Sequence, residues 1–151
     1  MNNLITTINY IVGRSTELKD KFTNASSAPV EFLCIFCQNE EEYKQFTRSI
    51  ETAGKIVQRT PSGFTYLLEK SIETIAGPLR LVKVRKPDPQ RLERGDADFN
   101  TEYKNFKKTY QGPILVMPVN PATRDKFRAH GVIHFCRQED VAKKLREILG
   151  F

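Results

Sequence analysis

The sequence has no long hydrophobic segment and few cysteines, and each absence excludes a class of protein. No apolar run approaches the roughly 20 residues that a membrane-spanning helix needs, so no membrane association is expected. The first residues, MNNL, lack the basic patch and apolar stretch of a secretory signal, and a cytoplasmic location is therefore expected. Three cysteines in 151 residues are an odd number, which argues against a disulfide-stapled secreted scaffold and favours reduced thiols.

Sharp catalytic and metal-binding signatures are also missing. The sequence holds no P-loop, no G-x-G-x-x-G, no G-x-S-x-G and no H-E-x-x-H. Cys34 and Cys37 spell C-x-x-C, but they fall inside a predicted strand, where residues three apart point to opposite faces. We therefore predict two buried structural thiols rather than a redox pair. His130, His134 and Cys136 raise the alternative of a metal, but no second pair stands at a zinc spacing, so we predict neither a metal nor a cofactor.

The composition is that of a globular protein with a modest basic excess. Hydrophobic residues make up 39% and charged residues 28%, and the net charge is +6. A length of 151 residues suits one domain with one hydrophobic core. A positive charge attracts nucleic acid, phosphorylated metabolites or acidic surfaces, but lysine and arginine are spread along the chain. Plain solubility is the preferred interpretation, with nucleic acid and a small anion as alternatives.

Hydrophobic spacing predicts an α+β fold in one domain, 1–151, built from three parts. In 1–29, apolar residues recur every three or four positions, which predicts an amphipathic helix over 3–22 and a polar connector. In 30–94, an apolar run predicts a buried strand, and Asn39 is the expected N-cap of a helix that Gly54 ends. Three further strands are expected in this part, at 55–60, 63–69 and 78–86.

The third part, 95–151, is predicted as a diverged second half. A short strand over 96–101 is followed by a short helix around Tyr103, Phe106 and Tyr110. The chain then reads strand, helix, strand, helix. The expected strands are 114–119 and 132–136, and the expected helices are 121–130 and 139–149.

The segment 83–99, KVRKPDPQRLERGDADF, is the most distinctive in the chain. Arginine clusters suit bidentate recognition of phosphate or carboxylate, and loops displayed by rigid strands commonly carry function. Arg85, Arg91 and Arg94 are therefore candidate ligand-binding residues. The alternative is a solvated, internally salt-bridged loop, whose surface ion pairs contribute little each.

The predicted order over 30–86 resembles the βαβββ module of the vicinal-oxygen-chelate (glyoxalase-like) superfamily. The chain looks most like its YecM-type small bacterial proteins, which also begin with a helix. The resemblance covers about residues 1–110; the segment RKPDP…RGDADF is also similar to one in uncharacterised bacterial proteins. The tail departs from the family's second module and favours an alternative, a ferredoxin-like or other two-layer α/β sandwich. The matching stretches are CIFCQN at 34–39, AGK at 53–55, PSG at 61–63 and PDP at 87–89.

The resemblance also implies a set of site residues. In metal-dependent relatives, inward-facing histidine and glutamate side chains hold a divalent cation, and the matching positions here are Glu31, Lys83 and Asp98. A protonated lysine places a positive charge where the metal would lie and has no lone pair to ligate it. The resemblance thus implies a metal-free ion triad, Glu31–Lys83–Asp98; the alternative is three unrelated surface charges.

The resulting hypothesis is a metal-free, glyoxalase-like protein that binds a small acidic ligand. The cupped sheet would supply an apolar lining, with Lys83 and the three arginines facing the acid. Whether the protein is an enzyme is left open; in a reaction, Glu31 or Asp98 would be the general base and Lys83 would stabilise an oxyanion. The expected apolar lining is Leu33, Ile35, Tyr66, Leu79 and Leu81, with Tyr66 also a ligand-binding candidate.

Three alternatives belong to other classes. A nucleic-acid-binding module would use the basic region 80–108, including Tyr103, Lys104, Lys107 and Lys108, and its affinity would fall steeply with salt. A metal-dependent lyase or isomerase-type enzyme would hold one ion per chain. An interaction protein would form a homodimer through an exposed sheet edge.

Overall fold

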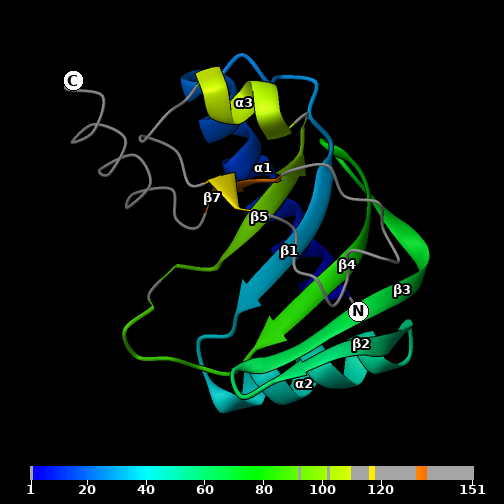
Figure 1. The fold of residues 1–151 in the computed structure, drawn as a ribbon. Coiled ribbons are helices and arrows are strands. Elements are labelled where there is room, and N and C mark those ends of the chain that lie inside the picture. Colours follow the sequence, from blue (N-terminus) through cyan, green and yellow to red (C-terminus); the bar gives the residue numbers. More distant parts are fainter. Residues whose placement is uncertain (1, 92, 102, 110–115, 118–131, 136–151) are drawn as a thin grey trace.

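The computed structural model describes residues 2–91, 93–101, 103–109, 116–117 and 132–135 (Figure 1). It confirms an α+β fold, with helices packed on a mixed sheet of seven strands. In chain order the elements are α1 (Asn2–Phe22), β1 (Val30–Phe36), α2 (Glu40–Glu51), β2 (Gly54–Thr60), β3 (Gly63–Thr74), β4 (Gly77–Arg85), β5 (Gly95–Asn100), α3 (Tyr103–Thr109), β6 (Val116–Met117) and β7 (Val132–Phe135).

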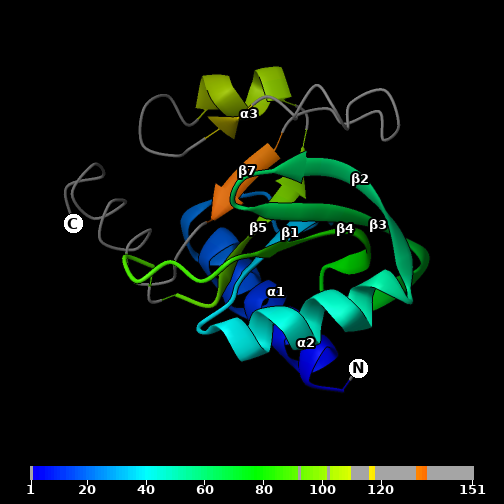
Figure 2. The ribbon, with the colours of Figure 1, turned by 90° about the horizontal axis from the view of Figure 1, so that it is seen from below.

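The strands lie in the order β2-β3-β4-β1-β5-β7-β6. From β1 the chain passes through α2 to β2, then returns by two antiparallel pairings to β4, which lies parallel to β1. β5 pairs with the other edge of β1 in antiparallel fashion, and β7 continues beyond it. β1 is therefore a central strand, with β4 on one side and β5 on the other (Figure 2).

The start of β5 requires a glycine because the backbones of β5 and β1 approach closely there. Gly95 has φ +157, and a Cβ at this position would collide with the Cys34 carbonyl oxygen. Glycine has no Cβ and tolerates this conformation. The close approach fixes the register in which Ile35 faces Gly95, and with it the partners of every residue of β1 along β5.

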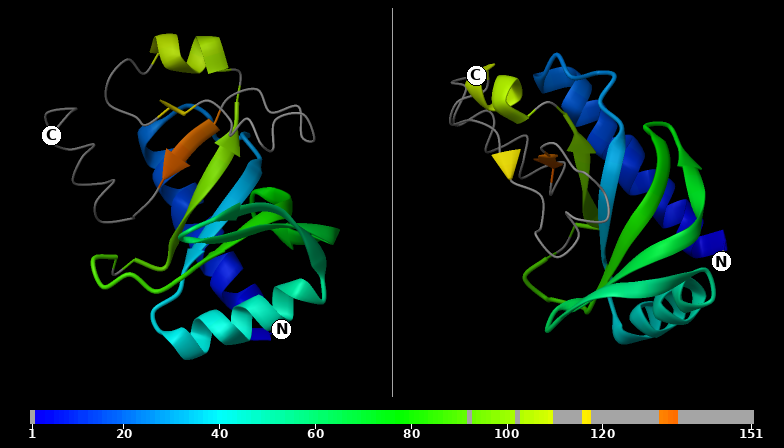
Figure 3. Two further views of the ribbon diagram at one scale, coloured as in Figure 1. Left: turned by 60° about the horizontal axis from the view of Figure 1, so that its bottom comes forward. Right: turned by 45° about the vertical axis from the view of Figure 1, so that its right-hand side comes forward.

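The main hydrophobic core lies between the sheet and α1, which runs along one face (Figure 3). Alternation along β1 sends Leu33 and Ile35, both 0% exposed, into this helix-side core. From α2, Phe46 and Ile50 join the same cluster. The α1 residues in it are Leu4, Ile8, Ile11, Val12 and Leu18.

Most predicted elements are found within one or two residues of their expected bounds. Asn39 is the N-cap of α2, and its side-chain oxygen accepts a hydrogen bond from the Glu42 amide at 2.8 Å. β3 runs to Thr74, five residues beyond the expected end, because its last three residues pair with the start of β4, whereas the segment after Leu68 is polar apart from Ile72. The expected helices 121–130 and 139–149 lie outside the described residues, and the last two strands are described only at their centres.

The two predicted buried thiols are confirmed as such. Cys34 is 5% and Cys37 2% exposed, and both are free cysteines. Cys37 belongs to the helix-side core, whereas Cys34 does not. The pair is therefore split between the two faces of the sheet, as the strand geometry predicts.

Candidate functional site

A row of polar residues crosses the sheet on the face opposite α1. Thr65 of β3 pairs with Lys83 of β4, Lys83 pairs with Cys34 of β1, and Cys34 pairs with Asp96 of β5. Directly paired residues point to the same face, so these four side chains lie side by side on four adjacent strands. Gln58 of β2 extends the row, because it is opposite Thr65 and accepts a hydrogen bond from its hydroxyl at 3.3 Å. We call this face of the sheet the polar face.

The neighbouring rows place further charges on the polar face. Arg85 pairs with Phe36 one row away from Lys83, and Asp98 pairs with Phe32 one row away from Asp96. Basic side chains therefore come from β4 and acidic side chains from β5. The strand between them, β1, carries the uncharged residues Phe32, Cys34 and Phe36.

The pKa of the Cys34 thiol reports the field at the centre of this face. Burial raises it well above the ordinary value, as does the Asp96 carboxylate, and Asp98 adds a smaller effect in the same direction. Lys83 and Arg85 act in the opposite sense and lower it. All four charges thus act on one buried sulfur atom, which stays a neutral thiol and is unsuited to nucleophilic catalysis.

Lys83 is half-buried, and within the described residues its ammonium makes one hydrogen bond. Its Nζ donates one hydrogen bond, to Thr60 Oγ1 at 3.0 Å, and Thr60 in turn donates to the Gly63 carbonyl. An ammonium has three N–H donors. In the part of the chain that the structure describes, two donors of Lys83 are therefore left for another acceptor.

Lys83 and Glu31 of the expected ion triad each have another hydrogen-bond partner. Lys83 donates to Thr60, while Glu31 accepts from the Asn100 side chain at 3.4 Å. The β1–β5 register shifts between Val30 and Phe32, so Glu31 lies in the irregular part of this strand pairing. Lys83 and Asp98 stand on different rows of strands β4 and β5, with β1 between them. Their catalytic roles stay predictions.

Two of the three candidate arginines are packed around one aromatic ring. The guanidinium groups of Arg85 and Arg91 lie 5.4 and 4.9 Å from the centroid of Phe36. Asp88 approaches both, at 3.6 Å from Arg85 and 3.8 Å from Arg91. This is the internally salt-bridged arrangement weighed above, although both arginines stay partly exposed and can reach a ligand.

Arg94 and Tyr66 are directed to the helix side of the sheet. Arg94 forms a bidentate ion pair with Glu42 of α2, at 2.6 and 3.0 Å, and also donates to Thr7 of α1 at 3.4 Å. Burial raises the pKa of Glu42, but the hydrogen bonds from Arg94 and the Gln38 amide outweigh it and hold the pKa below its ordinary value. Tyr66 is 1% exposed within the helix-side core, and burial raises its pKa to about 12.

Four of the five residues of the expected apolar lining are placed differently from the expectation. The fifth, Leu81, is 3% exposed and pairs with Phe32 on the polar face. Tyr66, Leu33, Ile35 and Leu79 all belong to the helix-side core. Each is at most 1% exposed, so they hold the helices against the sheet rather than line a ligand pocket. The pattern of apolar residues in these strands predicted burial correctly, but it did not say which face would be covered by helices.

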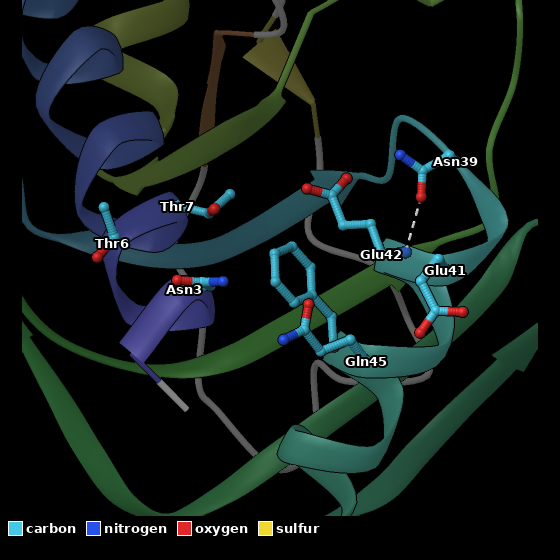
Figure 4. Close-up of a pocket in the computed structure, with 8 residues that line it drawn as sticks. Asn3, Thr6, Thr7, Asn39, Glu41, Glu42 and Gln45 are labelled. Atoms are coloured by element: carbon cyan, nitrogen blue, oxygen red, sulfur yellow. Dashed lines mark hydrogen bonds between the residues drawn. The ribbon is translucent and has the colours of Figure 1, made fainter.

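A polar groove lies between the N-terminal turns of α1 and α2 (Figure 4). Its volume is about 470 Å³, and it is open to solvent. Phe46 of the helix-side core lines it, and so does Glu42, which is already engaged by Arg94. Its other lining residues are Asn3, Thr6, Thr7, Asn39, Glu41 and Gln45. The groove is on the helix side and is therefore separate from the polar face.

Two classes of site have no support within the described residues. No group of three or more histidine, cysteine, aspartate or glutamate side chains there is arranged to hold a metal ion. His130 and Cys136 of the alternative metal site lie outside those residues. None of the described helices is both long and apolar enough to cross a membrane.

The sequence reasoning missed Cys34, Asp96 and Thr65 as members of a polar row. Cys34 was considered only for redox chemistry, and Asp96 looked like one of several acids near a loop. Their alignment with Lys83 depends on the parallel β1–β4 and antiparallel β1–β5 registers. Alternation within 79–85 did place Lys83 and Arg85 on one face, and that was the available signal.

No family model, curated protein or solved structure matches this chain, so its function must be argued from the chemistry of the polar face.

Proposed function

We propose that this chain binds a small anionic molecule on the polar face, with Lys83 as the main contact and Arg85 as the second. The observation that carries the proposal is the half-buried Lys83 ammonium, of which one N–H donor is used within the described residues. A partly buried cation interacts with an anion more strongly than an exposed one, because less water screens the charge. Arg85 stands one row further along the same strand, on the same face, but it also pairs with Asp88 at 3.6 Å and is therefore the weaker contact.

The resemblance to the vicinal-oxygen-chelate superfamily is part of this proposal. The order β1–α2–β2–β3–β4, with β4 returning beside β1, supports it. A shared fold implies a place for a ligand but not a reaction, so the proposal is for binding. The Lys83 ammonium favours a metal-free site, because it would repel a cation at the same position.

A nucleic-acid interface is less well supported. Its basic region contains Arg80, whose guanidinium donates twice to the Leu68 carbonyl, at 3.1 and 2.9 Å. Arg91 and Arg94 are engaged with acidic residues of the same chain. Exposed cations without partners in the protein bind phosphate best. Arg80, Arg91 and Arg94 already use N–H donors within the protein, so they are less available for phosphate.

Dimerisation through the sheet edge has features against it as well. β2 is one edge of the sheet, and it carries the exposed Lys55 and Arg59 and a register shift between Ile56 and Gln58. Charged residues and bulges on an edge strand are common devices that prevent pairing with another chain.

The test is a binding measurement with matched lysine variants. Wild type, Lys83→Met and Lys86→Met would be titrated with phosphate, acetate, succinate and citrate, with calorimetry as the readout. Lys86 is exposed and lies directly after β4, so the two variants lose the same charge at neighbouring positions. Loss of a charged hydrogen bond predicts about tenfold or greater weakening for Lys83→Met and little change for Lys86→Met. The proposal is wrong if no anion binds, or if both variants weaken binding equally.

A further inference from the structure

The polar groove between α1 and α2 is separate from the polar face and has the size of a ligand site. Its volume of about 470 Å³ falls within the range of roughly 300–1,000 Å³ that is usual for small-molecule sites. Asn3 extends into it from α1 and Gln45 from α2, and their side chains point toward each other (Figure 4). What the groove holds depends on the hydrogen-bonding groups of these and the other lining side chains.

Three of the lining residues are amides whose hydrogen-bonding capacity is largely unused. The side chains of Asn3 and Gln45 make no hydrogen bond within the described residues. The side-chain oxygen of Asn39 accepts from the Glu42 amide, which fixes the direction of its NH2 group, and that group has no partner in the described part of the chain. A side-chain amide offers two N–H donors and a carbonyl acceptor. The groove therefore presents donors and acceptors side by side.

The charges along the groove do not favour an ionic ligand. No lysine, arginine or histidine is among the described residues that line it, so an anion finds no lining cation there. Of its two carboxylates, Glu42 is already paired with Arg94 at 2.6 Å. The other, Glu41, is exposed, and a single ion pair at an exposed position contributes little. An uncharged ligand fits this lining best.

We propose that the groove binds a neutral polyhydroxy molecule, a sugar or a cyclic polyol. A hydroxyl group both donates and accepts hydrogen bonds, so neighbouring hydroxyls match the donor and acceptor that each amide presents together. The C–H groups of such a ring pack against Phe46 and the aliphatic carbons of the polar lining side chains. This inference does not rest on the proposed anion site, because the groove is on the helix side of the sheet.

Other uncharged or cationic ligands would use fewer of these groups. A hydrophobic molecule would take water from the amides without replacing its hydrogen bonds, which is costly. A primary ammonium group only donates, so the amide N–H groups would gain no acceptor from it. Because the groove is open to solvent, each hydrogen bond to a sugar replaces one to water, and the expected affinity is in the millimolar range.

The experiment is a nuclear magnetic resonance titration of isotope-labelled protein, which reports binding residue by residue. Glucose, maltose and myo-inositol are the polyols, cyclohexanol has the ring of inositol with a single hydroxyl, and putrescine is the cationic comparison. The groove variants are Gln45→Ala and Asn39→Ser, since serine keeps an N-cap oxygen for α2 but has no NH2 group. Asn9→Ala is the matched control, because Asn9 is an exposed amide on α1 outside the groove. Gln45 is exposed, so Gln45→Ala decides the question if circular dichroism shows that Asn39→Ser unfolds.

We expect at least one polyol to shift the backbone amide signals of the groove residues, with a Kd in the millimolar range. Each groove variant should weaken this binding by about fivefold or more, the loss of roughly one hydrogen bond, and Asn9→Ala should leave it unchanged. The proposal is overturned if no polyol shifts these signals, or if cyclohexanol or putrescine binds there as tightly. It is also overturned if the groove variants weaken binding no more than the control does. Lys83→Met should not affect polyol binding, so this proposal and the anion site can fail separately.

Discussion

Replacement of Lys19 by methionine should destabilise the fold more than any other single-lysine substitution in α1. Lys19 is 0% exposed, and its Nζ donates to Asp20 Oδ1 at 2.6 Å and to the carbonyls of Ala25 and Ser26 at 2.8 Å each. All three N–H donors are therefore used. Together they attach the connector between α1 and β1 to the last turn of the helix. The ammonium also lies 5.3 Å from the centroid of the Phe99 ring, where a cation–π attraction adds to the hydrogen bonds.

The magnitude follows from what the substitution leaves behind. Methionine fills the aliphatic volume of lysine, so the cavity contribution is small. Asp20 is 46% exposed in its side chain and can be rehydrated. The carbonyls of Ala25 and Ser26, which belong to a half-buried and an exposed residue, lose their charged donor, and a hydrogen bond to a charged group contributes about 1.5–3 kcal/mol. The expected loss is about 3 kcal/mol of unfolding free energy, or roughly 6–12 °C in Tm for a chain of this size.

Urea denaturation followed by circular dichroism measures this loss, and Lys21→Met is the control. Lys21 lies two residues away in the same final turn and is exposed, so it has the same chemistry without the burial. We expect the control to differ from wild type by about 0.5 kcal/mol or less. If Lys19→Met is as stable as Lys21→Met, the desolvation of the ammonium must cancel its three hydrogen bonds, and the reasoning is refuted.

Two further predictions concern the thiols and the Arg94–Glu42 ion pair. Burial raises the pKa of the Cys37 thiol to about 12 and that of Cys34 well above its ordinary value, so the folded protein at pH 8 should leave both unlabelled by iodoacetamide. Peptide mass spectrometry would read each cysteine separately, and labelling at the rate of the urea-unfolded chain would contradict the burial. The pKa of Glu42 is below its ordinary value of 4.5, so its ion pair contributes stability above that pH and loses it as the pH falls through the folded-state pKa. Glu42→Gln should therefore lower the free energy of unfolding by about 1 kcal/mol at pH 7 and by progressively less in acid. Glu40 is exposed, so Glu40→Gln should show no such pH dependence. If the free energy of unfolding of the two variants depended on pH in the same way, the stabilising role of the Arg94–Glu42 ion pair would be refuted.

Local sequence patterns were sufficient for most of the individual elements. The three- and four-residue spacing of apolar side chains predicted α1, because a helix places such residues on one stripe and that stripe must be buried. Asn39 followed by three glutamates predicted the start of α2, because both signals act within one helical turn. Strand β1 was predicted from its continuous apolar run, which reflects burial on both of its faces.

The distal half of β3 was missed because its stability comes from pairing rather than from composition. Glu69, Lys70 and Ser71 are exposed, so nothing in their hydrophobicity marks a strand. They lie in the register shift between β3 and β4, and the pairing resumes beyond them, where Ile72, Glu73 and Thr74 are opposite Leu79, Pro78 and Gly77. Partners of this kind are chosen by the whole sheet, and they are invisible in a window of a few residues.

The charges on the polar face show the same division. The sequence determined by itself that Lys83 and Arg85 share a face of their strand, because side chains alternate with a period of two. Only the tertiary structure decided that this face is opposite α1, that Cys34 and Asp96 stand in the same row, and that acids and bases lie on either side of β1. Lys19 likewise looks like an ordinary lysine in a basic last turn until the connector folds back and its carbonyls surround the ammonium. In each case the deciding contact joins residues from different elements, and its energy depends on a register and a burial that exist only once the sheet and helices have packed.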